Sequence, residues 1–219
     1  MSIGIKSPGK EPTQMYVVEK IDKLPRKRGY DIVKRIMDFM MAFVGLVVLI
    51  IPMMIIGIVI VIDSPGNPIY AQVRLGMNEK PFTLYKFRSM RMDAEKNGIQ
   101  WAETDDPRVT KIGRILRDYR LDELPQLWNI LKGDMSFVGP RPERPEYYDL
   151  FDTYIDGFRQ RMMVMPGLTG HAQIHGGYDL LPEEKIIYDI EYMKNRSIRF
   201  DWICIIGTIK TVLGREGAH

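Results

Sequence analysis

The chain has 219 residues, enough to bury one substantial core, and its 45% content of hydrophobic residues excludes a wholly disordered protein. Its single cysteine, Cys204, excludes an intrachain disulfide. The net charge of +3 is concentrated in residues 1–35, which carry nine Lys and Arg against four Asp and Glu. A basic cluster directly before an apolar run is typical of an anionic membrane surface, whereas nucleic-acid binders spread basic residues over a folded face. We therefore expect membrane lipids, and no nucleic acid, as partners.

Residues 1–29 are polar and contain prolines, and we expect a mobile tail before a helix that begins near Tyr30. Residues 39–62 form an apolar run of 24 positions without a charged side chain. A straight helix of this length measures about 36 Å at about 1.5 Å per residue, against a hydrocarbon core of about 30 Å. Lys34, Arg35 and Asp38 precede the run at helical spacing, and we expect them to anchor it at the membrane boundary.

Pro52 divides the apolar run into 13 residues before it and 10 after it. A proline inside a helix removes one backbone hydrogen bond and clashes with the preceding turn, so we expect a kink. Each arm would measure about 15–20 Å, roughly one leaflet. The residues alone leave two topologies open. One is a spanning helix, and the other is a re-entrant helix-break-helix hairpin over residues 30–63 that enters and leaves the same face.

Residues 64–219 are expected to form one domain together with this hairpin, with an α+β, mainly helical fold. Two strand-like runs, Ile69 to Leu75 and Phe82 to Phe87, predict a small β-hairpin. Basic and apolar residues alternate at helical spacing over residues 108–119, and residues 200–213 repeat apolar residues at similar spacing. We expect both segments to be amphipathic helices at the membrane interface.

The most informative stretch is residues 120–142, which begins with an adjacent carboxylate pair and ends in a Gly-Pro-Arg-Pro loop. Asp122 precedes a predicted helix, and we expect it to be the helix N-cap. Capping explains one carboxylate but not the second, Glu123. Two adjacent acids need nearby positive charge, which the surrounding arginines and a metal ion can supply. Helix N-termini also attract phosphate, so the pattern favours a site for phosphoryl chemistry.

Two segments, RLDELPQLWN at residues 120–129 and LKGDMSFVGPRP at residues 131–142, resemble the signature of the bacterial sugar transferases, the small monotopic phosphoglycosyl transferases. Shorter similarities occur in the expected order at residues 34–38, 85–90 and 166–173. The resemblance covers about residues 30–215.

The resemblance implies transfer of a sugar-1-phosphate from a UDP-sugar to a polyprenol phosphate such as undecaprenyl phosphate, with release of UMP. This reaction would be the first membrane step of exopolysaccharide, capsule, O-antigen or glycoprotein glycan synthesis. Asp122 would be the nucleophile that forms a covalent phosphosugar intermediate beside Mg²⁺, and Glu123 would support the metal or the proton balance. The candidate substrate- and phosphate-binding residues are Lys86, Arg88, Arg117, Arg120, Arg141 and Gln173.

Nucleotide-sugars are cytosolic, so this function favours the re-entrant hairpin and a location on the cytoplasmic face of the bacterial inner membrane. Uncovered apolar faces also make a homodimer plausible. The chain departs from the family at Ile51, where many relatives have serine, and at His171 and His175. We expect these histidines to be structural or solvent-facing, and not metal ligands.

Two other function classes compete with this prediction. A metal-dependent phosphatase or glycosidase is disfavoured, because adjacent carboxylates on one helix start rarely flank a glycosidic bond from both sides. A non-catalytic membrane scaffold, in which Asp122 merely caps a helix, remains the alternative.

Overall fold

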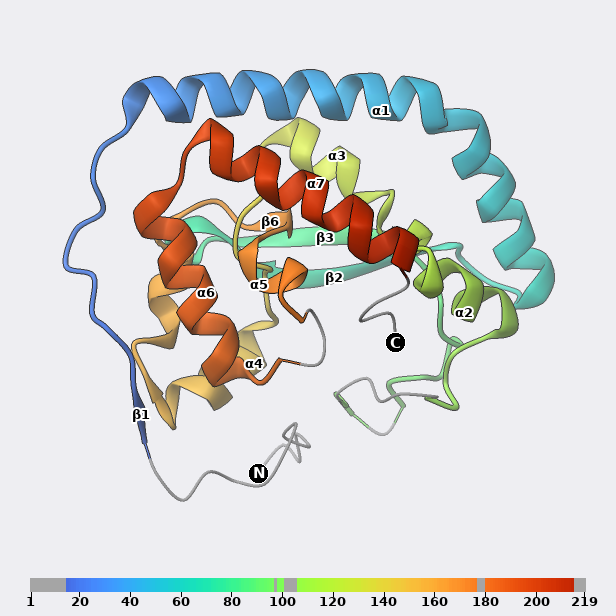
Figure 1. Ribbon diagram of the computed structural model, residues 1–219. Helices are drawn as coiled ribbons and strands as arrows, with labels where there is room; N and C mark the ends of the chain where they lie inside the picture. Colours follow the sequence, from blue (N-terminus) through green and yellow to red (C-terminus); the bar gives the residue numbers. More distant parts are fainter. Residues whose placement is uncertain (1–14, 97, 101–105, 177–179, 215–219) are drawn as a thin grey trace.

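The computed structural model describes residues 15–96, 98–100, 106–176 and 180–214. In this part of the chain, helices surround a few short strands, which confirms a mainly helical α+β fold (Figure 1). The α-helices are α1 (Arg28–Asp63), α2 (Lys111–Asp118), α3 (Gln126–Lys132), α4 (Pro145–Asp152), α5 (His171–Ile174), α6 (Pro182–Asn195) and α7 (Ile198–Gly214). The 3-10 helices are η1 (Met77–Glu79), η2 (Leu121–Glu123) and η3 (Phe158–Met163). The strands are β1 (Tyr16–Val17), β2 (Ile69–Leu75), β3 (Pro81–Phe87), β4 (Ser136–Val138), β5 (Ile155–Asp156) and β6 (Gly167–Thr169).

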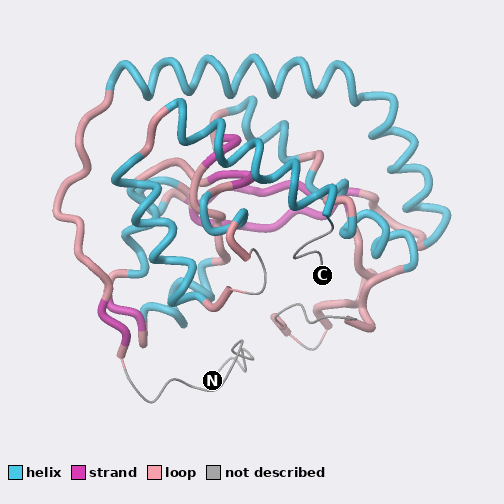
Figure 2. Tube along the Cα trace, in the orientation of Figure 1, coloured by secondary structure: helices cyan, strands magenta, loops and turns pink. Residues whose placement is uncertain are grey.

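The long apolar segment forms one uninterrupted helix, α1, with Pro52 inside it. The prediction of a helix-break-helix hairpin is therefore wrong in its local detail. Figure 1 shows a sharp bend in the second half of α1, and Figure 2 shows that the helix continues through it. Proline costs one hydrogen bond and bends the axis, but the bonds on either side keep the helix intact. By its length and composition, α1 is long and apolar enough to cross a membrane. Only 6% of its most apolar 18-residue stretch is buried against the rest of the protein.

One face of α1 packs against the rest of the protein. Before the bend, Ala42 and Leu46 pack with Leu127 and Ile130 of α3. Gly45 lies so close to α3 that a Cβ atom there would be 3.2 Å from the Leu127 side chain. After the bend, α1 packs into a second cluster, which includes Ile60, Phe87 and Leu116. The two arms of α1 are therefore held by two different apolar clusters.

The described part of the predicted tail, residues 15–27, is ordered against the domain, so the expectation of a mobile segment is wrong there. β1 pairs in parallel with β5, and Figure 2 shows the two strands side by side. Val18, Ile21 and Leu24 pack against the main core. Spaced three residues apart, these apolar side chains supply the burial that a mobile tail lacks. Residues 1–14 of the predicted tail lie outside the described part of the chain.

The three predicted anchor residues turn inward and fasten α1 to the domain. Arg35 donates from Nη1 to the Ile130 carbonyl at 2.7 Å and from Nη2 to the Leu131 carbonyl at 2.8 Å, near the end of α3. Asp38 accepts from the Phe137 amide of β4 at 3.0 Å. Lys34 pairs with Asp201 of α7 at 3.1 Å. These side chains therefore contact three other elements, α3, β4 and α7, and anchor α1 to the rest of the protein.

The predicted β-hairpin is confirmed, with β2 and β3 antiparallel from the Ile69–Phe87 pair to the Leu75–Pro81 pair. The wholly buried Asn129 of α3 holds this hairpin in place. Its side chain accepts from the Tyr85 amide at 3.1 Å and donates to the Thr83 carbonyl at 2.7 Å. The two amphipathic segments are also helical, as α2 and α7, and α2 begins at Lys111 because Thr110 caps it through the Gly113 amide at 2.9 Å.

A buried ion pair joins η3 to α6, with Arg161 Nη2 and Asp189 Oδ2 2.7 Å apart and both side chains 1% exposed. Replacing Arg161 by alanine leaves the Asp189 charge uncompensated, and we expect the free energy of unfolding to fall by about 3–5 kcal/mol. Denaturant unfolding in detergent measures this change. The matched control is Arg159→Ala, which removes only exposed ion pairs to Glu79, Asp149 and Asp152 and should cost about 1 kcal/mol or less. Equal losses in the two variants would contradict the prediction.

Candidate active site

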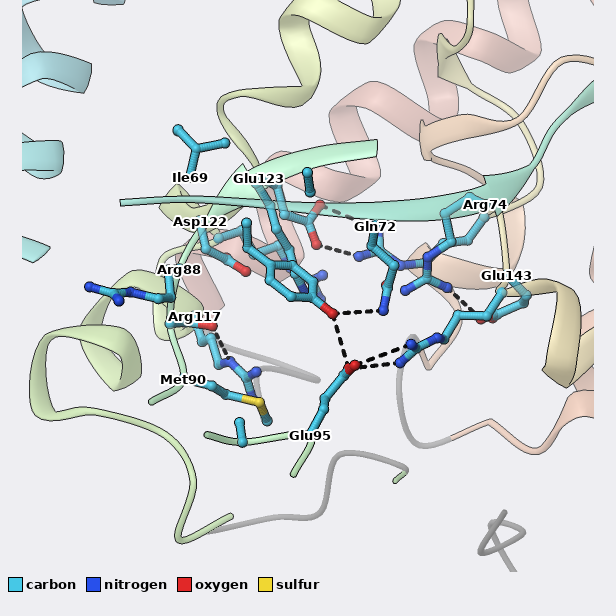
Figure 3. A pocket seen from close by; sticks show the side chains of 18 of the residues that line it. Ile69, Gln72, Arg74, Arg88, Met90, Glu95, Arg117, Asp122, Glu123 and Glu143 are labelled. Atoms are coloured by element: carbon cyan, nitrogen blue, oxygen red, sulfur yellow. Dashed lines mark hydrogen bonds and ion pairs between the residues drawn. The ribbon is translucent and has the colours of Figure 1, made fainter. Parts of the chain in front are cut away.

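The carboxylate pair lies in η2, the short turn between α2 and α3, at the wall of a cavity of about 580 Å³ (Figure 3). Asp122 and Glu123 are both buried, at 8% and 7% exposure. The expected helix cap is wrong, because Pro125 is the N-cap residue of α3 and no side chain caps that helix. The preceding Arg120 has a left-handed backbone, with φ of 53°, which starts a separate turn. Asp122 is therefore placed at the cavity without a structural role as a cap.

Glu123 is held by an arginine from the Gly-Pro-Arg-Pro loop. Arg141 Nη2 lies 2.5 Å from Glu123 Oε1, and Nη1 lies 3.3 Å from Oε2. Burial alone would raise the pKa of Glu123, but the charge and hydrogen bonds of Arg141 outweigh burial and hold this pKa below its usual value. Glu123 is therefore an ionised partner of Arg141.

Asp122 has a different environment, although it is the adjacent residue. No residue in the described part of the chain donates a hydrogen bond to its carboxylate. Burial, and then the negative charge of Glu123, raise the pKa of Asp122 to about 6, opposed by Lys86, Arg117 and Arg141. Burial lowers the pKa of the Lys86 ammonium to about 8, opposed chiefly by Asp122. The site therefore presents one carboxylate with open lone pairs among cations, which is the environment required of a nucleophile toward phosphate.

All six predicted substrate-binding residues line the cavity. Five of them have side chains available to an anionic ligand: Lys86, Arg117, Arg120, Arg141 and Gln173. Arg117 on α2 donates from Nε to Ser89 Oγ at 2.9 Å. The amide oxygen and nitrogen of Gln173 are both buried without a hydrogen-bond partner. An unpaired buried amide is costly in a folded protein, so Gln173 is a strong candidate to bind a ligand.

Arg88 borders the same cavity, but its guanidinium serves the backbone. It donates to the carbonyls of Ser64 and Pro65, directly after α1. Figure 3 shows this side chain pointing away from Asp122. Arg88 therefore closes the turn that connects α1 to the hairpin, and we leave it out of the proposed substrate contacts.

The sequence reasoning missed one wall of the cavity, which Tyr70, Gln72 and Arg74 of β2 provide. Side chains two residues apart share a face of a strand, and Tyr70 lies directly opposite Lys86 in the hairpin register. This alternation is the signal that could have found them. At the rim, Glu95 accepts from Tyr70 at 3.0 Å and from Arg144 at 2.8 Å. Figure 3 shows dashed contacts converging on the Glu95 carboxylate.

The two histidines do not line this cavity. His171 Nε2 lies 3.1 Å from Glu191 Oε2, and its ring packs edge-on against Tyr188 and Phe200. His175 stacks on Tyr188. The histidines therefore join α5 to α6 and α7, in agreement with a structural role.

A Mg²⁺ site can be tested against the residues present. The described part of the chain holds no cluster of three His, Cys, Asp or Glu side chains arranged for a metal. Mg²⁺ does not require such a cluster, because it commonly keeps several waters and binds one or two carboxylates plus substrate phosphates. The Asp122 carboxylate fits this mode because its lone pairs are open, whereas those of Glu123 face Arg141. The residues fit a magnesium ion held mainly by Asp122 and substrate phosphates.

Comparison with known proteins assigns this chain to a family. Residues 29–215 match the profile described as bacterial sugar transferase. The chain belongs to the bacterial sugar transferase family. It is 40% identical over 193 residues to the UDP-N-acetylgalactosamine-undecaprenyl-phosphate N-acetylgalactosaminephosphotransferase of Aeromonas hydrophila, a match that covers 87% of this chain and 46% of the relative.

Two further relatives are covered over a larger share of their own length than the Aeromonas protein. A UDP-glucose:undecaprenyl-phosphate glucose-1-phosphate transferase of Caulobacter vibrioides is 35% identical over 213 residues, covering 94% of this chain and 79% of the relative. A putative undecaprenyl-phosphate N-acetylgalactosaminyl 1-phosphate transferase of Bacillus subtilis is 51% identical over 133 residues, covering 61% and 74%. The chain thus spans about half the length of the Aeromonas relative and about three quarters of these two.

Proposed function

We propose that this protein transfers a sugar-1-phosphate from a UDP-sugar to undecaprenyl phosphate and releases UMP, as the first membrane step of a bacterial surface glycan. The observation that carries this proposal is the buried Asp122 carboxylate, which has open lone pairs and lines a cavity rich in Lys and Arg. The cavity volume of about 580 Å³ falls within the usual range of small-molecule sites, about 300–1,000 Å³. The names of the relatives from Aeromonas and Caulobacter support the same general reaction.

The proposed reaction has two displacements at the sugar-linked phosphorus. An Asp122 oxygen attacks this phosphorus, its bond to the bridging oxygen breaks, and UMP leaves with that oxygen. A phosphate oxygen of undecaprenyl phosphate then attacks the same phosphorus, which frees the Asp122 carboxylate and forms a diphosphate linkage. Lys86, Arg117 and Arg141 spread the negative charge that develops on the phosphoryl oxygens. Glu123 holds the Arg141 guanidinium in position at the cavity wall.

Mg²⁺, held by Asp122 and the substrate phosphates, would neutralise charge on the diphosphate when bound. The assay that tests the function supplies a panel of UDP-sugars, Mg²⁺ and undecaprenyl phosphate, and measures UMP. We expect UMP release from at least one UDP-sugar. EDTA should abolish this release, and added Mg²⁺ should restore it. The absence of UMP with every common UDP-sugar would refute the proposal.

The alternative of a non-catalytic scaffold depended on Asp122 as a helix cap. Because Asp122 caps no helix in the structure, that alternative has no supporting observation. A panel of UDP-sugars is needed because the named relatives differ in their sugar, with N-acetylgalactosamine in one and glucose in another.

We further propose that α1 is re-entrant and that the rest of the chain lies on the cytoplasmic face of the inner membrane. Contacts between the chain before α1 and the chain after it support this topology. Lys27 Nζ donates to the Arg196 carbonyl at 2.7 Å, and Arg196 Nη2 donates to the Pro25 carbonyl at 2.8 Å. A spanning helix would place these groups on opposite sides of the bilayer, where they could not meet.

Cysteine labelling in sealed vesicles tests this topology. Lys23 precedes α1, Lys96 follows it, and both are exposed, whereas the native Cys204 is wholly buried. A membrane-impermeant maleimide should label Lys23→Cys and Lys96→Cys from the same side, and Cys204 of the parent protein should remain unlabelled. Labelling from opposite sides would contradict the re-entrant arrangement.

A further inference from the structure

A second cavity, of about 270 Å³, adjoins the active site along α7. Its walls are mainly apolar, with Leu121, Leu124 and Leu168 on one part and Ile205, Ile209 and Val212 of α7 on another. We call these six residues the apolar groove. Ile209 is 55% exposed, so the groove is open along α7. Unlike the first cavity, it has almost no charged lining.

The apolar groove and the catalytic cavity share three lining residues, Arg120, Glu123 and Gln173. A ligand that occupied both would need an anionic group at the shared end and an apolar chain in the groove. Two of the shared residues suit an anionic group. Arg120 is a cation that lowers the pKa of Glu123, and Gln173 has a buried amide without a partner.

The backbone at the shared end is also unusual. Arg120 is one of the few described residues other than glycine with a positive φ, at 53°. This conformation costs energy in a residue with a side chain, and it persists only where the surrounding structure imposes it, often at binding sites. It lies directly between α2, whose Arg117 lines the catalytic cavity, and η2, whose Leu121 lines the apolar groove. The strained residue therefore marks the junction of the two cavities.

We propose that the apolar groove binds the first isoprenoid units of the acceptor lipid, with the acceptor phosphate at the Arg120 and Gln173 end. This inference rests on the proposed function. A UDP-sugar has polar groups at both ends and gains nothing from an apolar groove, whereas a prenyl phosphate matches both the charge of the shared end and the apolar walls. Two other apolar side chains of α7, Trp202 and Ile203, are also exposed, at 44% and 49%.

The test compares groove-filling variants with a matched control on the same helix. Ile209→Trp and Val212→Trp add bulk inside the groove, whereas Ile206→Trp adds the same side chain to an exposed position that does not line it. We expect the groove variants to raise KM for undecaprenyl phosphate about tenfold, equivalent to about 1.4 kcal/mol of lost binding. The control should keep the parent KM. The UMP burst without an acceptor reports the first step separately and should change far less than KM.

Photo-crosslinking provides a second measurement that does not depend on turnover. A benzophenone amino acid at position 209 should crosslink to undecaprenyl phosphate, and the same group at position 206 should crosslink less. Equal KM changes in the control and groove variants, unchanged KM in all variants, or crosslinking at position 209 to bulk phospholipid alone would overturn the inference. Absence of the UMP burst in the parent protein would instead refute the proposed function, so the two failures are distinguishable.

Discussion

Replacing Asp122 by asparagine is expected to lower kcat on the order of 10³-fold or more, because asparagine keeps the shape of the side chain but removes the nucleophile. The acceptor-free burst of UMP should disappear. Mass spectrometry after incubation with a UDP-sugar should find a phosphosugar adduct on the parent protein and none on the variant. Activity within about tenfold of the parent would exclude Asp122 as the nucleophile.

The same variant is expected to be at least as stable as the parent protein. Burial and the charge of Glu123 raise the pKa of Asp122, so the ionised carboxylate destabilises the folded state at pH values above that pKa. Asparagine removes this charge. Asp118→Asn is the matched control, because Asp118 is four residues away on α2 and lines neither cavity. It should retain parent activity and stability, so a loss of activity in Asp122→Asn with normal melting isolates the chemical role.

Arg141→Ala is expected to reduce both activity and stability. It removes a cation from the phosphate site, which should lower kcat about 10²- to 10³-fold. It also leaves Glu123 buried and unpaired, which should cost about 3 kcal/mol, the lower end for a broken buried pair because the Arg141 side chain is 27% exposed. Turnover and thermal melting in detergent measure the two effects.

A double variant separates the two roles of Arg141. Arg141→Met combined with Glu123→Gln removes both charges, and we expect it to recover much of the lost stability while activity stays low. Arg141→Lys keeps the charge without the two-point contact and should fall between the parent and Arg141→Ala. If the double variant recovered activity as well as stability, Arg141 would have no direct part in phosphate binding.

Features that depend on local pattern could be predicted from the sequence. The 24-residue apolar run and the alternation of the β-hairpin predicted the long apolar helix and one sheet, and the signature at residues 120–142 predicted two carboxylates that the structure places at the wall of one cavity. The structure differs from the sequence-based prediction where the contacts of a side chain depend on residues far away in the chain. Lys86 and Arg88 lie two residues apart and both line the cavity, yet the Arg88 guanidinium donates to the carbonyls after α1.

Long-range contacts account for the other differences. The docking of residues 15–27 depends on pairing with β5, about 140 residues later in the chain, which no local period indicates. Asp122 appeared to be a helix cap because the helix seemed to begin there, but the left-handed Arg120 inserts a separate turn before α3. The wall formed by Tyr70, Gln72 and Arg74 is positioned in part by Asn129, which ties the hairpin to α3 from more than 40 residues away in the chain.

On the proposed topology, the fastening of α1 to the rest of the protein also sets the depth of Asp122. Lys34, Arg35 and Asp38 fix the first arm of α1, and Ile60 packs the second arm against Phe87 and Leu116. The height of Asp122 relative to the exposed apolar face of α1 is therefore set by the protein core. On the proposed topology, a bilayer of different thickness would have to adapt its own surface to the protein, because Asp122 cannot be raised or lowered without unpacking that core.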